Sequence, residues 1–112
     1  MKQIENLPEL LSALETEGVT LLVGANWCGP CKRFRPHFEK AEAELSDEGF
    51  DTDFRAVYID DVAGADEGSL ANILGIQHVP TVFHFTSDDT LEVKSQTVLP
   101  LIKEMKEIYS NG

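Results

Sequence analysis

The two cysteines of this chain, Cys28 and Cys31, are separated by only two residues. They follow an apolar run, Thr20–Val23, that is typical of a buried strand, and they precede a stretch with helical periodicity. The first turn of a helix has unpaired N–H groups and partial positive charge, which favour an anion there. A thiolate is such an anion, and it is the nucleophile of disulfide exchange. Cys31 follows one helical turn later, within reach of Cys28. We therefore interpret the pair as a dithiol that attacks disulfides and then closes its own.

The residues beside the cysteines fit this interpretation. Pro30 presets φ for the first helical turn and has no N–H to leave unpaired. Gly29 leaves room for another chain to approach the sulfur atoms. Lys32 adds a positive charge close by, and it is equally consistent with an effect on the thiol and with an ordinary solvated helix residue.

The run Trp27–Lys32 reads WCGPCK, which is the active-site motif of the thioredoxin family, and the chain resembles that family. A second similarity lies far along the chain, where Val79-Pro80-Thr81 resembles the family's cis-proline loop. Pro36 matches the proline inside the family's active-site helix, and Ile59-Asp60 matches the end of its third strand. The resemblance extends from about Ile4 to Tyr109.

The resemblance implies a protein-disulfide reductase in which Cys28 attacks a substrate disulfide and Cys31 resolves the mixed disulfide. It implies no bound cofactor, with electrons from NADPH through a thioredoxin reductase, disulfide-containing proteins as substrates, and a monomer. Gly29-Pro30 resembles the reducing members of the fold. Two alternatives stay open: a specialised protein with few partners, or a binding subunit whose dithiol is incidental. A zinc site is disfavoured, because a single CxxC motif supplies only two of four ligands.

Substrate-binding residues follow from the same resemblance. Trp27 is expected to form a wall beside the dithiol, with ordinary partial burial as the alternative. If the peptide bond before Pro80 is cis, the backbone of Val79 is placed to pair with an extended substrate. His78 is expected in the same groove. Gln96 stands where the family has a glycine, and it is assigned to the substrate-binding surface with that departure noted.

Two further departures lie beneath the predicted site. Leu22 stands where the family has a buried aspartate, and Ala56 stands where it has the lysine that pairs with it. The loss of both together is coherent, because either charge alone would be stranded in the interior at a cost of several kcal/mol. In the family the buried aspartate is suggested to help deprotonate the second cysteine. With Leu22 at that position, Cys31 must rely on water or another base.

Composition bounds the remaining possibilities. Residues 1–112 are expected to form a single domain, and the net charge of −11, from 20 acidic and 9 basic residues, argues against nucleic acid and anionic membranes as partners. The charge is consistent with solubility or with steering toward basic partners. Met1–Leu14 does not resemble a signal peptide, and no apolar run reaches the length of a membrane span. We expect a cytoplasmic protein.

The predicted elements give an α/β fold, with a central mixed β-sheet flanked by helices on both faces and the CxxC motif at the carboxyl end of a central strand. Strands are predicted at residues 1–5, Val19–Val23, Phe54–Ile59, Thr81–Phe85 and Leu91–Ser95. Helices are predicted from Asn6 to Gly18 with Leu7, Leu10, Leu11 and Leu14 on the buried face, over Pro30–Leu45 and Ser69–Leu74, and with Pro100 in the first turn of a terminal helix.

The segment Asp60–Gly68 is acidic and longer than the family pattern. We interpret it as a solvated surface insertion, since it lacks the ligand spacing of a calcium loop. Of the other histidines, His37 is expected at the surface and His84 as a hydrogen-bonded structural residue within a strand.

Overall fold

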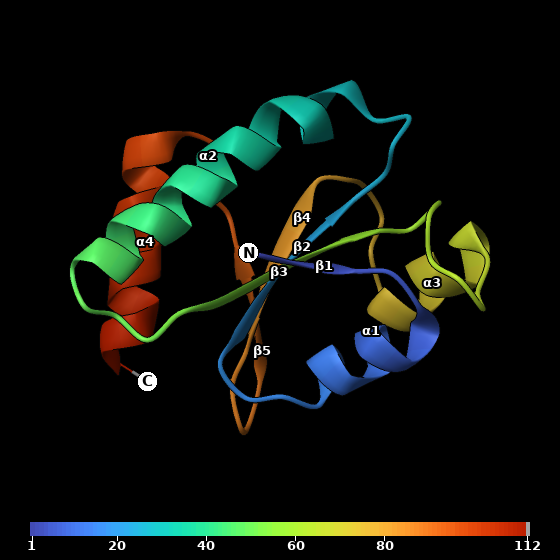
Figure 1. The fold of residues 1–112 in the computed structure, drawn as a ribbon, viewed down its shortest axis with the longest axis horizontal. Helices are drawn as coiled ribbons and strands as arrows, with labels where there is room; N and C mark the ends of the chain where they lie inside the picture. The colour runs from blue at the N-terminus through green and yellow to red at the C-terminus, as the bar shows by residue number, and fades with distance from the viewer. Residues whose placement is uncertain (112) are drawn as a thin grey trace.

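A computed structural model describes residues 1–111 of the chain (Figure 1). Within them the strands form a five-stranded sheet in the order β1-β3-β2-β4-β5. The central strand β2 is parallel to β3, which is parallel to β1, while β4 and β5 run antiparallel. The predicted mixed sheet is therefore confirmed. Strand bounds are Lys2–Ile4 for β1, Val19–Gly24 for β2, Asp53–Tyr58 for β3, Thr81–Phe85 for β4 and Thr90–Val93 for β5.

Helices cover both faces of this sheet, as predicted. Figure 1 shows α1 and α3 on one side and α2 and α4 on the other. Successive side chains of a strand point to opposite faces, so Leu21 of β2 packs in the core beneath α1 and α3 while Leu22 packs beneath α2 and α4. All of β2 is buried, as its unbroken apolar run predicted. Helix bounds are Leu7–Leu14 for α1, Gly29–Asp47 for α2, Glu67–Leu74 for α3 and Val98–Asn111 for α4.

The start of α1 is as predicted, and Leu7, Leu10 and Leu14 pack in or against the core as expected, but the end of the helix and the exposure of Leu11 differ from the prediction. The Asn6 side chain accepts a hydrogen bond from the N–H of Glu9 at 2.9 Å, which is the expected cap. The helix ends at Leu14, and Gly18 instead adopts a φ of 91° in the turn to β2. Leu10 and Ala13 form the buried stripe, whereas Leu11 is 44% exposed. Leu11 lies a quarter-turn from Leu10, beyond the edge of the contact with the sheet.

The apolar stripe of α2 is buried as predicted, and it builds the core on its side of the sheet. Its buried residues are Cys31, Phe34, Phe38, Ala41 and Leu45. The Phe38 ring lies 4.7 Å from the ring of Phe54 in β3, measured between centroids. This packing fixes the helix, and with it the cysteines at its first turn, against the carboxyl end of β2.

At the opposite end of β2 a buried polar network ties α4 to the sheet. The Thr20 hydroxyl lies 2.8 Å from His84 Nδ1 and 2.8 Å from the Tyr109 hydroxyl. Tyr109 also donates to the Gly18 carbonyl and accepts from the N–H of Asp53. All of these bonds form together when His84 donates from Nδ1 to Thr20 and Thr20 donates to Tyr109. His84 is thus the structural histidine that was predicted.

Because burial lowers the pKa of His84 below its usual value of 6.5, the network makes stability depend on pH. The unfolded chain binds a proton at a higher pH than the folded chain does, so the free energy of unfolding should decrease as the pH falls below 6.5. We expect His84→Gln to flatten this dependence in denaturant titrations between pH 5 and 8. His37→Gln is the matched control and should keep it. Equal pH dependence in the His84→Gln protein and the parent would contradict the assignment.

Candidate active site

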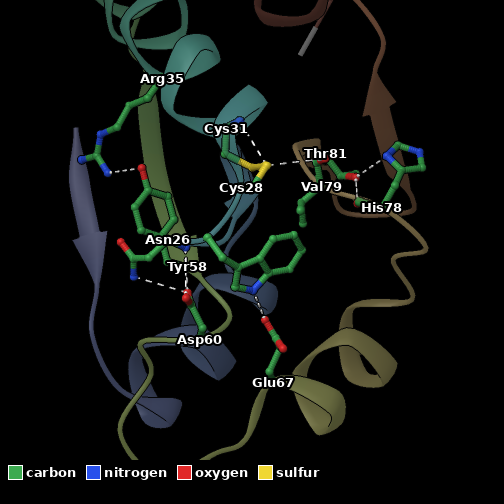
Figure 2. The surroundings of a disulfide bond; sticks show 11 residues. Asn26, Cys28, Cys31, Arg35, Tyr58, Asp60, Glu67, His78, Val79 and Thr81 are labelled. Atoms are coloured by element: carbon green, nitrogen blue, oxygen red, sulfur yellow. Dashed lines mark hydrogen bonds between the residues drawn. A yellow bond between two sulfur atoms is a disulfide. The ribbon is translucent and has the colours of Figure 1, made fainter.

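Cys28 and Cys31 form a disulfide at the first turn of α2, with their Cα atoms 5.3 Å apart (Figure 2). Cys28 is the N-cap of the helix, and its Sγ accepts a hydrogen bond from the N–H of Cys31 at 3.1 Å. Pro30 stands in the first turn, as expected. Cys28 is 4% exposed and Cys31 is 1% exposed. The sulfur of Cys28 therefore receives the positive end of the helix and an N–H donor, which are the two conditions that stabilise a thiolate.

The loop that carries Cys28 is held by an acidic residue from the next strand. Asp60 accepts hydrogen bonds from the backbone N–H of Asn26 at 2.9 and 3.1 Å and from its side-chain amide at 3.3 Å. Asp60 is exposed, as predicted for its acidic segment, and the sequence did not reveal these hydrogen bonds. Two adjacent parallel strands, β2 and β3, end side by side, so the residues just after them meet.

The cis-proline loop lies against the disulfide. The Val79–Pro80 peptide bond is cis, as predicted. The carbonyl oxygen of Val79 lies 3.8 Å from Cys28 Sγ (Figure 2). Thr81 fastens the loop by donating from its hydroxyl to the His78 carbonyl at 2.7 Å. The backbone of Val79 is therefore placed beside the sulfur that would be attacked or released.

The structure brings some of the predicted substrate-binding residues together and leaves others apart. Trp27, His78 and Val79 line one pocket. The His78 ring is exposed and turned toward the Thr81 hydroxyl, 3.5 Å away. Gln96 is exposed between β5 and α4, outside the pocket lining, and Lys32 is exposed on α2. A Cβ on Gly29 would make an ordinary van der Waals contact with the flexible Arg33 guanidinium at 3.5 Å, and no backbone atom crowds that side.

Trp27 is 65% exposed, and a contact that the sequence did not reveal holds it in place. Its indole N–H donates to Glu67 Oε1 at 2.5 Å (Figure 2). Glu67 was predicted to lie in a solvated loop, but α3 begins at Glu67, two residues before the predicted start, with Asp66 as its N-cap. The carboxylate of Glu67 is thereby fixed at the rim of the active site.

Trp27 and Glu67 enclose a pocket of about 280 Å³ with α3 and the cis-proline loop. The remaining apolar lining comes from Ile59, Ala71, Ile76 and Val79. Glu67 is its one carboxylate, and neither lysine nor arginine lines it among residues 1–111. The pocket therefore combines an apolar interior, an indole face and one negative charge next to the disulfide.

Leu22 and Ala56 lie in the apolar core beneath α2 and α4. These two residues are partners in the β2–β3 ladder, and both are fully buried. Gly24, on the same face of β2 as Leu22, lies directly under Cys31: a Cβ on Gly24 would meet Cys31 Cβ at 3.3 Å and the Tyr58 ring at 3.1 Å. Gly24 therefore makes the room in which the Tyr58 ring lies next to Cys31.

A cation from α2 covers Tyr58. The Arg35 guanidinium lies 5.4 Å from the centre of the Tyr58 ring and donates to the Tyr58 hydroxyl at 3.0 Å (Figure 2). It also donates to Gln3 of β1 at 2.9 Å. The sequence analysis did not identify Gly24, Tyr58 or Arg35 as part of this region. Of the three, only Arg35 has a local signal, the spacing of four residues that places it one helical turn after Cys31.

Neither a metal-binding cluster nor a membrane-spanning helix is found among residues 1–111. In that range no cluster of three or more histidine, cysteine, aspartate or glutamate side chains has the arrangement of a metal site. No helix in the same range is both long enough and apolar enough to cross a membrane.

Comparisons with known proteins agree with this geometry. A family model described as thioredoxin matches residues 3–107. The thioredoxin of Mycoplasmoides gallisepticum is 33% identical over 109 residues, which cover 96% of this chain and 98% of that protein. A protein disulfide-isomerase from Oryctolagus cuniculus is 36% identical over 73 residues, and the match covers 65% of this chain but only 13% of that much longer protein.

Solved structures share the fold. Thioredoxin O1 from Arabidopsis thaliana in the oxidized state superposes with a TM-score of 0.74 at 22% identity, covering 96% of each chain. The oxidised thioredoxin of Plasmodium falciparum gives a TM-score of 0.73 at 19% identity, covering 97% of this chain and 98% of the other.

Proposed function

The chain belongs to the thioredoxin family, and we propose that the protein acts as a protein-disulfide reductase through Cys28 and Cys31. Thiol–disulfide exchange is the chemistry of this family's CxxC pair. Our proposal is that the exchange runs in the direction that reduces substrate disulfides. The observation that supports it best is Cys28 Sγ at the N-cap of α2, where it accepts the N–H of Cys31. That position favours the thiolate form, which the reduced protein needs in order to attack.

The reaction has two exchange steps. In the first, the Cys28 thiolate attacks one sulfur of a substrate disulfide, the substrate S–S bond breaks, and its other sulfur leaves as a thiolate that takes a proton from water. In the second, Cys31 loses its proton and attacks Cys28 Sγ. The mixed disulfide breaks, the second substrate sulfur leaves, and the Cys28–Cys31 disulfide forms. Two electrons have passed from the dithiol to the substrate.

The surroundings of the cysteines support particular roles in these steps. The carbonyl of Val79, 3.8 Å from Cys28 Sγ, can accept a hydrogen bond from the reduced thiol, and the backbone beside it can align an extended substrate. Trp27 offers a broad apolar surface to the same substrate. Cys31 has no ionisable partner at Leu22 or Ala56, so water or another base takes its proton.

The electron source, oligomeric state and location belong to the same proposal. We propose that electrons come from NADPH through a thioredoxin reductase, that the protein works as a cytoplasmic monomer, and that its substrates are disulfide-containing proteins. Gly29-Pro30 between the cysteines supports a role in reducing substrate disulfides, because the reducing members of the family have a similar sequence between their two cysteines.

An insulin-reduction assay tests the proposal. With NADPH and a purified thioredoxin reductase, the parent protein should consume NADPH and precipitate the insulin B chain. The Cys28→Ser/Cys31→Ser double variant should do neither. If dithiothreitol supports turnover and no thioredoxin reductase does, the reductase activity stands and the donor is wrong. If no reductant supports turnover of a folded protein, the proposed function is overturned.

A further inference from the structure

We propose that the pocket between Trp27 and α3 selects protein disulfides with a lysine or arginine next to the attacked cysteine, with Glu67 as the specificity-determining residue. The inference rests on the proposed function and deepens it by naming a substrate class. It starts from Glu67, the one carboxylate that lines this pocket among residues 1–111.

The first observation is the way Glu67 is held. One carboxylate oxygen accepts the Trp27 indole N–H, and no hydrogen bond to the other oxygen is present within residues 1–111. A carboxylate has acceptor capacity for several donors. Glu67 therefore fixes the indole and keeps an acceptor for an incoming cation, at the mouth of a pocket that touches Val79 of the cis-proline loop.

The second observation is the shape and chemistry of the pocket. Its volume of about 280 Å³ suits a single long side chain. Ala71 and Ile76 provide apolar surface for a methylene stem. The face of Trp27, which is 65% exposed, can bind a cation above the ring. A lysine or arginine side chain can contact the apolar surface, the Trp27 face and the Glu67 carboxylate together. An aliphatic side chain would leave the carboxylate without a partner, and an acidic side chain would be repelled by it.

The third observation is charge complementarity over a longer range. The net charge of the chain is −11, and the acidic residues Asp60, Asp61 and Asp66 lie in the segment that leads into α3. The exposed cations Lys32 and Arg33 lie instead on α2. A substrate with basic residues on the α3 side is therefore attracted in the orientation that places them at Glu67.

Matched disulfide peptides test the inference. We would measure kcat/KM for three peptides that carry lysine, norleucine or glutamate in the positions flanking one cysteine. Norleucine keeps the stem of lysine and removes its charge. The parent should prefer the lysine peptide over the norleucine peptide by about fivefold at low salt, and the glutamate peptide should react most slowly. The preference should shrink as salt is added.

Glu67→Gln is the decisive variant, because glutamine keeps a carbonyl to accept the Trp27 indole N–H and removes only the charge. The lysine-to-norleucine ratio should fall to about twofold, the part that the indole face alone supplies. Asp61→Asn removes an equal charge from the acidic segment but outside the pocket lining, so it should lower the ratio far less than Glu67→Gln does. Using the ratio within each variant cancels any general change in activity.

The outcomes separate the two proposals. A parent that reduces all three peptides equally, or a ratio that Glu67→Gln leaves intact, overturns this inference and leaves the reductase activity standing. An equal loss of preference in Asp61→Asn and Glu67→Gln would assign the effect to overall charge and also overturn the inference. If the parent reduces no peptide, the proposed function fails first and the substrate preference fails with it.

Discussion

The Cys31→Ser protein should accumulate stable mixed disulfides with its substrates, whereas the Cys28→Ser protein should accumulate none. Cys28 is the attacking sulfur because it caps α2 and accepts the N–H of Cys31. Cys31 faces the core, next to Gly24 and Tyr58, where it can reach Cys28 but no substrate. Without Cys31 the mixed disulfide has no internal nucleophile to break it, so multiple turnover should be abolished. Non-reducing gels and mass spectrometry of trapped complexes measure this directly.

Alkylation of the reduced protein gives an independent check of the same assignment. Near neutral pH iodoacetamide should label Cys28 first, with Cys31 modified slowly because it is 1% exposed in the closed pair. Peptide mapping after brief labelling distinguishes the two sites. If the Cys28→Ser protein accumulated mixed disulfides, or if Cys31 were labelled faster than Cys28, the two cysteines would have the opposite roles.

Leu22→Asp should be the most destabilising single change near the site. Leu22 is fully buried against α2 and is paired across the sheet with Ala56, which offers no positive charge. An aspartate there has a pKa raised by burial. The unfolded chain then ionises first, so the free energy of unfolding should decrease as pH rises from about 3.9 to the raised folded pKa. Above that window the full loss persists, at about 2–4 kcal/mol including the lost leucine packing.

The double variant Leu22→Asp/Ala56→Lys tests the explanation. The two sites face each other in the β2–β3 ladder, so the second substitution should restore part of the stability lost with the first. Denaturant titrations from pH 4 to 8 on the parent, both single variants and the double variant give the coupling energy. A Leu22→Asp protein as stable at pH 8 as the parent, with no pH dependence of its own, would show that residue 22 is not enclosed beneath the disulfide.

Much of this fold was predictable from sequence because its signals are local. The unbroken apolar run of β2, the stripe of Phe34, Phe38 and Leu45 on α2, and the Asn6 cap each show their role within a few residues. The CxxC pair and the cis peptide bond before Pro80 were likewise identified from short motifs. The order of these elements along the chain then gave a mixed sheet with helices on both faces, whereas the strand order β1-β3-β2-β4-β5 was not predicted.

The contacts that shape the site were not predictable, because they join residues far apart in the sequence. Glu67 was predicted to lie in a solvated loop, because nothing in the sequence near it indicates a hydrogen bond to the Trp27 indole. Tyr58 appeared to be the end of a strand, and only Gly24 on the neighbouring strand explains why its ring fits beside Cys31. Leu11 was assigned to the buried face by its helical spacing, yet it lies on the side of α1 turned away from the sheet, next to the buried Leu10.

The position of Cys28 as a helix cap links the redox state of the sulfur to the folding of α2. Thiolate, neutral thiol and disulfide sulfur differ in strength as acceptors for the N–H of Cys31, and the charged form is the strongest. Each proton or electron that Cys28 gains or loses therefore changes how firmly the first turn of α2 is held. By thermodynamic reciprocity, a substitution that loosens that first turn must also change the acidity of the thiol and the reduction potential of the pair, even if it touches neither sulfur.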